Sequence, residues 1–126
     1  MPARAKILVV DDDRLVLGSV AAALRDARYR VWTADRGDEA VRIAVEVQPD
    51  IVVTDLRMPG MDGVALLEQV ERAADRTPRM VIYSATPPTD YVRPVPREVL
   101  WIVKASGHEP LLDALQRGER GTDRAP

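Results

Sequence analysis

The chain has 126 residues, a length that fits a single domain able to bury its own hydrophobic core. It has no cysteine and one histidine, which excludes a disulfide scaffold, a thiolate zinc site and cysteine nucleophile chemistry, and argues against a Ser-His-Asp hydrolase. A net charge of −2 argues against nucleic-acid binding driven by bulk charge. The sequence has neither a signal-peptide core nor the ~20 consecutive apolar residues that span a bilayer, so we expect a cytoplasmic protein without a membrane partner.

The first half of the chain predicts two strand–helix pairs. Residues 7–10 are wholly apolar, as a strand covered on both faces requires, and residues 29–33 form a weaker strand. Apolar residues at helical spacing predict helices over residues 14–27 and 38–47. Asp13 is the candidate N-cap of the first helix.

The second half continues the alternation. Apolar runs at residues 51–54, 80–83 and 99–103 predict three more strands, and helical spacing predicts helices over residues 62–73 and 109–117. Such alternation implies right-handed crossovers, and therefore an α/β fold with a parallel sheet and helices on both faces. Two caps are expected for these helices: Asp62 and Gly118.

Residues 85–98 interrupt this alternation of strands and helices. A fourth crossover helix belongs here, but prolines leave little room for one, so we predict that it is absent or reduced to about a turn. The last residues, 118–126, are small, polar and charged, and are expected to be a disordered tail or the start of a linker after a domain over residues 1–117. The prolines of the irregular segment are Pro87, Pro88, Pro94 and Pro96.

Polar side chains follow the predicted strands at the points where those strands end. Ligands of open parallel sheets bind outside the carboxyl ends of the strands, so these side chains are expected at one rim. A carboxylate, a hydroxyl or an ammonium group follows the first, third, fourth and fifth predicted strands. In chain order the rim residues are Asp11, Asp12, Asp13, Asp55, Ser84, Thr86 and Lys104.

This set fits phosphoryl chemistry assisted by magnesium. Clustered carboxylates repel one another unless a cation neutralises them, and oxygen ligands suit Mg²⁺. A carboxylate beside the ion can attack a phosphoryl group to give an aspartyl phosphate, whose oxygens a lysine and a hydroxyl would neutralise and hydrogen-bond. Taken singly, each residue would more often be a cap, a turn residue or a solvated side chain, which is how we interpret Asp62 and His108. The joint placement of the rim residues favours function.

Four motifs in chain order resemble the response-regulator receiver domain, the CheY-like module of two-component signalling. The resemblance covers roughly residues 6–117. It implies a flavodoxin-like, doubly wound five-stranded parallel sheet in the order 2-1-3-4-5. The motifs are ILVVDDD at residues 7–13, TDLRMPGMDG at residues 54–63, VIYSA at residues 81–85 and IVK at residues 102–104.

The resemblance also implies a phosphorylation site. Asp55 matches the phosphoacceptor, which takes a phosphoryl group from the phosphohistidine of a sensor histidine kinase or a phosphotransfer protein. Asp11 and Asp12 match the acidic pair that, with Asp55 and the main-chain carbonyl of Arg57, places Mg²⁺. Lys104 matches the lysine that pairs with the phosphoryl group.

Further positions match residues that respond to phosphorylation in receiver domains of this family. Ser84 matches the hydroxyl that turns toward the phosphoryl group, and Trp101 falls where the family keeps a switch aromatic residue. Arg57 and Thr86 occupy variable positions that tune how long the phosphate lasts.

The chain departs from the family pattern in two places. The family usually follows its lysine with a proline through a cis peptide, whereas Ala105 follows Lys104 here, and a cis bond before a non-proline residue costs about 3–4 kcal/mol. We therefore predict a trans peptide and a repositioned loop over residues 104–107. The reduced fourth helix would remodel the output face, where the family reads phosphorylation and often dimerises, and would leave Trp101 exposed or covered by residues 85–98.

The leading hypothesis is a bacterial signalling switch that catalyses only its own phosphorylation and dephosphorylation. Its signal would pass to an effector protein or to an output domain that these residues do not include. The oligomeric state is left open, with a homodimer as one alternative. One alternative is a receiver-like interaction module whose binding is largely independent of phosphorylation. A Mg²⁺-dependent phosphatase is disfavoured, because such enzymes usually have a second acid where Arg57 stands, and a nucleotide-binding enzyme would need a glycine fingerprint that is missing.

Overall fold

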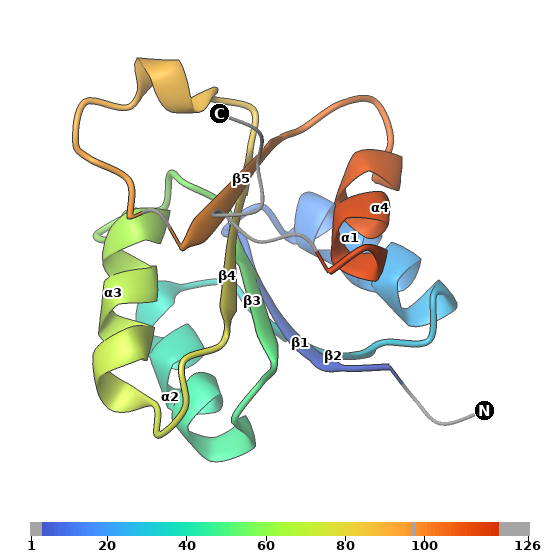
Figure 1. Cartoon of the computed structure of the whole chain (residues 1–126), viewed down its shortest axis with the longest axis horizontal. Helices are drawn as coiled ribbons and strands as arrows, with labels where there is room; N and C mark the ends of the chain where they lie inside the picture. Colours follow the sequence, from blue (N-terminus) through green and yellow to red (C-terminus); the bar gives the residue numbers. More distant parts are fainter. Residues whose placement is uncertain (1–3, 97, 119–126) are drawn as a thin grey trace.

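The structure is a computed structural model that describes residues 4–96 and 98–118. Its parallel strands form one five-stranded sheet in the order β2-β1-β3-β4-β5, which confirms the predicted doubly wound arrangement (Figure 1). The strands are β1 (Lys6–Val10), β2 (Arg30–Ala34), β3 (Ile51–Thr54), β4 (Arg79–Ser84) and β5 (Val99–Val103). The α-helices of the described residues are α1 (Arg14–Asp26), α2 (Gly37–Val47), α3 (Gly63–Ala73) and α4 (Glu109–Gln116).

Helices cover the sheet on both faces. α1 and α4 pack on one face, and α2 and α3 pack on the other (Figure 1). Because successive strand residues point to opposite faces, Ile7 and Val9 belong to the core under α1 and α4, whereas Leu8 and Val10 belong to the core under α2 and α3. These four side chains are at most 2% exposed, as the wholly apolar run predicted.

The two ends of α1 show how the local sequence sets the element boundaries. The Asp13 carboxylate accepts hydrogen bonds from backbone N–H groups of the first turn, which confirms this residue as the N-cap. At the other end, Arg28 adopts a left-handed φ of 74°, and the Tyr29 N–H donates to the Leu24 carbonyl. Tyr29 thus closes the helix, and β2 begins at Arg30, one residue later than predicted.

The other element boundaries also lie within one residue of their predicted positions. Asp62 caps α3 through its side chain, and Gly118 follows α4 with a left-handed φ of 73°, as predicted for both. The predicted disordered tail, residues 118–126, lies outside the described residues beyond Gly118. Among the described residues, none of the helices combines the length and the apolar character of a bilayer span.

The described residues between β4 and β5 form a single 3-10 turn, Pro88–Asp90, in place of a crossover α-helix. This confirms the predicted reduction of that helix, which follows from prolines that lack the N–H group a helix needs. The segment covers Trp101, whose side chain is 6% exposed. The Trp101 indole Nε1 donates to the Thr86 carbonyl (2.9 Å), and the indole ring lies 5.7 Å from the Tyr91 ring.

Asp62 anchors this segment to the start of α3. One carboxylate oxygen accepts from the Ala65 N–H (2.8 Å), and the other accepts from the Tyr91 hydroxyl (3.0 Å) and pairs with Arg93. Burial by itself would raise the pKa of Asp62, but the Ala65 N–H, the Tyr91 hydroxyl and the Arg93 guanidinium together hold this pKa below its usual value. The carboxylate therefore stabilises both the helix and the segment that replaces its missing neighbour.

Two substitutions of Asp62 separate these roles. Asp62→Ala is expected to lower the free energy of unfolding by about 1 kcal/mol for the cap, plus the loss of the Tyr91 and Arg93 contacts. Asp62→Ser retains a capping hydroxyl but loses those contacts, so its stability should fall less. In both variants, backbone amides of residues 89–93 should exchange faster with solvent, which hydrogen exchange measures. Unchanged exchange in the serine variant would contradict this anchoring role.

Candidate functional site

Three strand ends bring Asp11, Asp55 and Lys104 to one place. Each residue directly follows its strand, and its N–H continues the ladder by donating to a carbonyl of the neighbouring strand. The side chain two positions before each of them belongs to the core under α1 and α4, or packs against it. Because side chains alternate along a strand, all three point to the α1–α4 face. The core residues in question are Val9, Val53 and Ile102.

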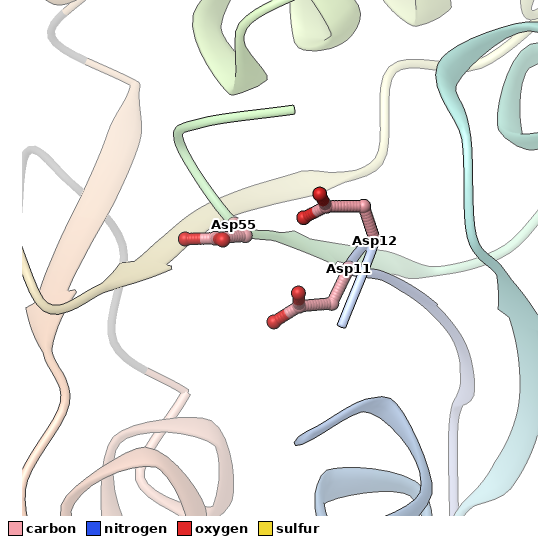
Figure 2. A group of neighbouring side chains, drawn as sticks. All are labelled: Asp11, Asp12 and Asp55. Atoms are coloured by element: carbon pink, nitrogen blue, oxygen red, sulfur yellow. The ribbon is translucent and has the colours of Figure 1, made fainter. Parts of the chain in front are cut away.

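Asp11, Asp12 and Asp55 form an acidic cluster at this rim. Each offers a carboxylate oxygen, and these oxygens lie within 4.8 Å of one another. Figure 2 shows the side chains of Asp11 and Asp12 extending from the end of β1 toward the end of β3, where Asp55 lies. Asp11 is buried, Asp55 is half-buried and Asp12 is exposed, so the cluster opens to solvent on one side. An all-oxygen donor set of this kind fits Mg²⁺, which retains several waters. Asp13, the cap of α1, is not part of it.

Lys104 provides positive charge beside the cluster. Its Nζ donates to Asp11 Oδ2 at 3.1 Å and lies 3.8 Å from Asp55 Oδ1. Only 20% of the lysine side chain is exposed, so solvent screens these interactions less than it would at an open surface. The peptide bond between Lys104 and Ala105 is trans, as predicted from the missing proline.

The β3–α3 loop holds the Asp55 carboxylate at the rim. Asp55 Oδ1 accepts a hydrogen bond from the Leu56 N–H (2.8 Å), and the Gly63 N–H donates to the Leu56 carbonyl (2.7 Å). Gly63 approaches so closely that a Cβ atom there would lie 2.3 Å from the backbone oxygen of Asp55. Only glycine therefore lets α3 start directly against the strand end that carries this carboxylate.

The pKa of Asp55 lies above its usual value. Burial is the largest cause and the Asp11 carboxylate adds to it, whereas Lys104, the Leu56 N–H and the Ser84 hydroxyl lower the pKa. The folded protein thus disfavours the ionised form. A group of this kind stabilises the fold below its unfolded pKa of about 3.9, and the stabilisation is lost as the pH rises through the folded pKa.

Asp55→Asn is therefore expected to raise the free energy of unfolding at pH 7. The gain should shrink as the pH falls through and below the unfolded pKa of about 3.9, because the carboxyl group is then protonated in both states. Urea unfolding of both proteins across this pH range measures it. Asp26→Asn, on the exposed side of α1, controls for the change in net charge. A gain at Asp55 that does not vary with pH would contradict the burial of an unfavourable charge.

Ser84 and Thr86 connect the acidic cluster to the segment between β4 and β5. Ser84 is 2% exposed, and its Oγ accepts a hydrogen bond from the Thr86 N–H (3.2 Å). Thr86 in turn accepts from Trp101 at its carbonyl and from the Arg57 Nε at its hydroxyl (3.5 Å). The predicted switch and tuning residues thus lie in one hydrogen-bonded group beside Asp55.

Several interactions near the site were not predicted from the sequence. His108 was interpreted as a surface residue without a role, yet it is half-buried and bonded to Tyr83 and Ser19. Tyr91 and Arg93 were not singled out, although both bind Asp62. For Tyr83 a signal existed, because alternation along β4 places it on the same face as Lys104. The irregular segment offered no periodicity from which to place Tyr91 or Arg93.

A family model described as the response regulator receiver domain matches residues 7–115. The chain belongs to this family. Receiver domains are signalling modules that interact with histidine kinases and downstream effectors and bind Mg²⁺ at an acidic pocket. The expectation drawn from the four motifs is therefore confirmed at the level of the family and its fold.

Individual relatives agree with this assignment. The transcriptional regulatory protein PrrA from Mycobacterium leprae is 41% identical over 85 residues, which are 68% of this chain and 36% of PrrA. LiaR from Bacillus subtilis, also a transcriptional regulatory protein, is 31% identical over 121 residues, covering 92% of this chain and 56% of LiaR. Among solved structures, the chemotaxis protein CheY4 from Vibrio cholerae has a TM-score of 0.75 and 31% identity, covering 91% of this chain and 98% of CheY4. The chain thus spans about a third of PrrA and just over half of LiaR.

Proposed function

We propose that this receiver is a phosphorylation-dependent signalling switch in which Asp55 accepts a phosphoryl group from the phosphohistidine of a histidine kinase or a phosphotransfer protein. The observation that carries the proposal is the joint position of the acidic cluster and Lys104. Three carboxylate oxygens lie within 4.8 Å of one another, and the ammonium group lies 3.8 Å from the half-buried Asp55. Structural roles such as caps and turns do not require this convergence.

Asp11, Asp12, Asp55 and the main-chain carbonyl of Arg57 would hold Mg²⁺, which when bound neutralises charge on the transferred oxygens. An Asp55 carboxylate oxygen attacks the phosphorus atom, so that an O–P bond forms while the P–N bond to the imidazole breaks. Lys104 balances the charge that the phosphoryl group adds at Asp55.

The signal would leave the site through Ser84 and Thr86. If the Ser84 hydroxyl turns toward the phosphoryl group, its hydrogen bond from the Thr86 N–H is lost. Thr86 also accepts from Trp101, which packs against Tyr91, so the change would reach the segment that replaces the fourth crossover helix. We propose that this remodelled output face passes the signal to an effector protein or to an output domain, as the transcriptional relatives suggest.

One observation favours an alternative, an interaction module largely independent of phosphorylation. Asp62 holds the segment between β4 and β5 through Tyr91 and Arg93, contacts that do not involve Asp55, and the segment presents Val92 with 95% of the residue exposed. A partner could bind this surface whatever the state of Asp55. The alternative predicts that phosphorylation leaves the segment unchanged.

Fluorescence of Trp101 distinguishes the two functions. The chain has two tryptophans, so Trp32→Phe leaves Trp101 as the single reporter. Adding beryllofluoride, a phosphoryl mimic, with Mg²⁺ should change its emission, and Asp55→Asn should abolish the change. Binding of beryllofluoride without any change at Trp101 would favour the interaction module, whereas no binding at all would contradict the proposed acceptor site.

A further inference from the structure

A chain of hydrogen bonds links three elements beside the acidic cluster. His108 Nδ1 lies 2.7 Å from the hydroxyl of Tyr83, which belongs to β4. Its Nε2 lies 2.9 Å from the hydroxyl of Ser19 on α1. His108 itself occupies the N-cap position of α4 but makes no capping hydrogen bond with its side chain. The histidine ring therefore ties the start of α4 to both β4 and α1.

The same tyrosine also contacts Lys104. The Lys104 Nζ lies 5.6 Å from the centroid of the Tyr83 ring, within the range of a cation–π interaction. The Tyr83 hydroxyl is 3.5 Å from the Gly107 carbonyl, and the Tyr83 and His108 rings meet edge to face at 5.7 Å. One side chain thus contacts the first residue of the β5–α4 loop and the last two.

The directions of these hydrogen bonds are consistent with one another. Burial, with a contribution from the Glu109 carboxylate, raises the pKa of Tyr83, so its hydroxyl remains a donor at neutral pH. In the neutral imidazole that carries its proton on Nδ1, the ring donates to the Tyr83 hydroxyl, which donates to the Gly107 carbonyl, and the Ser19 hydroxyl donates to Nε2. Each of the three polar side chains then has a partner.

We propose that the chain Tyr83–His108–Ser19 is a positioning device that holds Lys104 toward Asp11 and Asp55 during phosphoryl transfer. Lysine has a long, flexible side chain, and the loop that follows Lys104 has a trans peptide and no proline to restrain it. The hydrogen bonds tether this loop to the tyrosine that lies under the ammonium group. They therefore restrict both the loop and the lysine side chain. The device rests on the proposed function of Asp55, because it acts only through Lys104.

Lysine-selective ¹³C labelling tests the positioning directly. The chain has two lysines, and Lys6, which donates to the Val47 carbonyl far from the site, is an internal reference. Breaking the tether with His108→Leu should shift the Lys104 ε-methylene resonances, because the distance to the Tyr83 ring changes, and should leave those of Lys6 in place. Unmoved Lys104 resonances would overturn the proposal.

The rate of phosphorylation by acetyl phosphate with Mg²⁺ tests the consequence. His108→Leu and Tyr83→Phe, which keeps the aromatic ring, should each slow the reaction about fivefold at saturating donor, as expected for one lost hydrogen bond. His108→Gln, which can still bond to Tyr83, should restore most of the rate. In a Lys104→Met background the same substitutions should have no effect.

The outcomes separate this proposal from the proposed function. If the unaltered chain is phosphorylated and the tether variants are as fast, or if they slow the Lys104→Met protein equally, the positioning role is wrong and the switch stands. If the unaltered chain is not phosphorylated, both are wrong. Thermal unfolding of each variant identifies a rate loss that follows from a destabilised fold.

Discussion

Lys104→Met is expected to slow phosphorylation of Asp55 by roughly 10²–10³-fold, the loss typical of removing one preorganised charge-stabilising group. The reason is the position of the ammonium group, 3.1 Å from Asp11 and 3.8 Å from Asp55, where it balances the charge that an incoming phosphoryl group adds. Methionine retains much of the length and apolar character of the lysine side chain. The rate of mass gain with acetyl phosphate and Mg²⁺ measures the effect.

The same substitution should tighten Mg²⁺ binding, since it removes a positive charge from beside the acidic cluster. Isothermal titration with MgCl₂ measures this opposite change. Lys6→Met is the matched control, because Lys6 donates to the Val47 carbonyl away from the rim and should alter neither quantity. A Lys104→Met protein phosphorylated at the normal rate would exclude the role that we assign to this lysine.

Gly63→Ala is expected to destabilise the protein by about 1–3 kcal/mol, the usual cost of forcing an extra methyl group into a packed site. The added Cβ would lie 2.3 Å from the backbone oxygen of Asp55 and 3.0 Å from the Ile82 side chain. Because the first neighbour is a backbone atom, the loop itself must shift, and Asp55 shifts with it. Phosphorylation should therefore slow even where the variant remains folded.

Gly18→Ala is the matched control for this substitution. Gly18 lies inside α1, and a Cβ there would meet no atom within 4 Å, so alanine should stabilise the helix by roughly 0.5–1 kcal/mol. Urea unfolding gives both free energies. Equal effects at the two glycines would contradict the importance of the close approach between Gly63 and the backbone of Asp55.

The sheet and most helices could be predicted because local signals and tertiary packing agree. Residues 7–10 and 51–54 are buried on both faces, so their side chains are apolar except for Thr54 and both strands are easily recognised. Asp13 and Asp62 mark helix starts through a side-chain hydrogen bond that needs only local sequence. β2 begins one residue later than predicted because the Tyr29 N–H donates to the last turn of the preceding helix.

The absence of a crossover helix between β4 and β5 was also predictable, but the path of the chain that replaces it was not. Prolines exclude an α-helix from this segment, but they do not determine where the segment packs. That path depends on contacts of Tyr91 and Arg93 with Asp62, across about 30 residues of sequence. No periodic pattern encodes such pairings.

The candidate site falls between these cases. Its residues could be named because parallel strands bring their carboxyl ends to one rim, so position in a strand is enough to place Asp11 or Asp55. The residues that contact and position Lys104 could not be predicted from the sequence. Tyr83 lies under its ammonium group, and His108 binds Tyr83 through a side-chain hydrogen bond between separate elements. A single histidine with no neighbouring motif carries no signal of its partners.

The central claim is that Asp55 is the phosphoacceptor, and intact-mass measurement tests it most directly. After incubation with acetyl phosphate and Mg²⁺, the chain should gain the mass of one phosphoryl group. Asp55→Asn should gain none, and chelation of the metal should prevent the gain in the unaltered chain. No mass gain in the unaltered chain, or an equal gain in Asp55→Asn, would contradict the account.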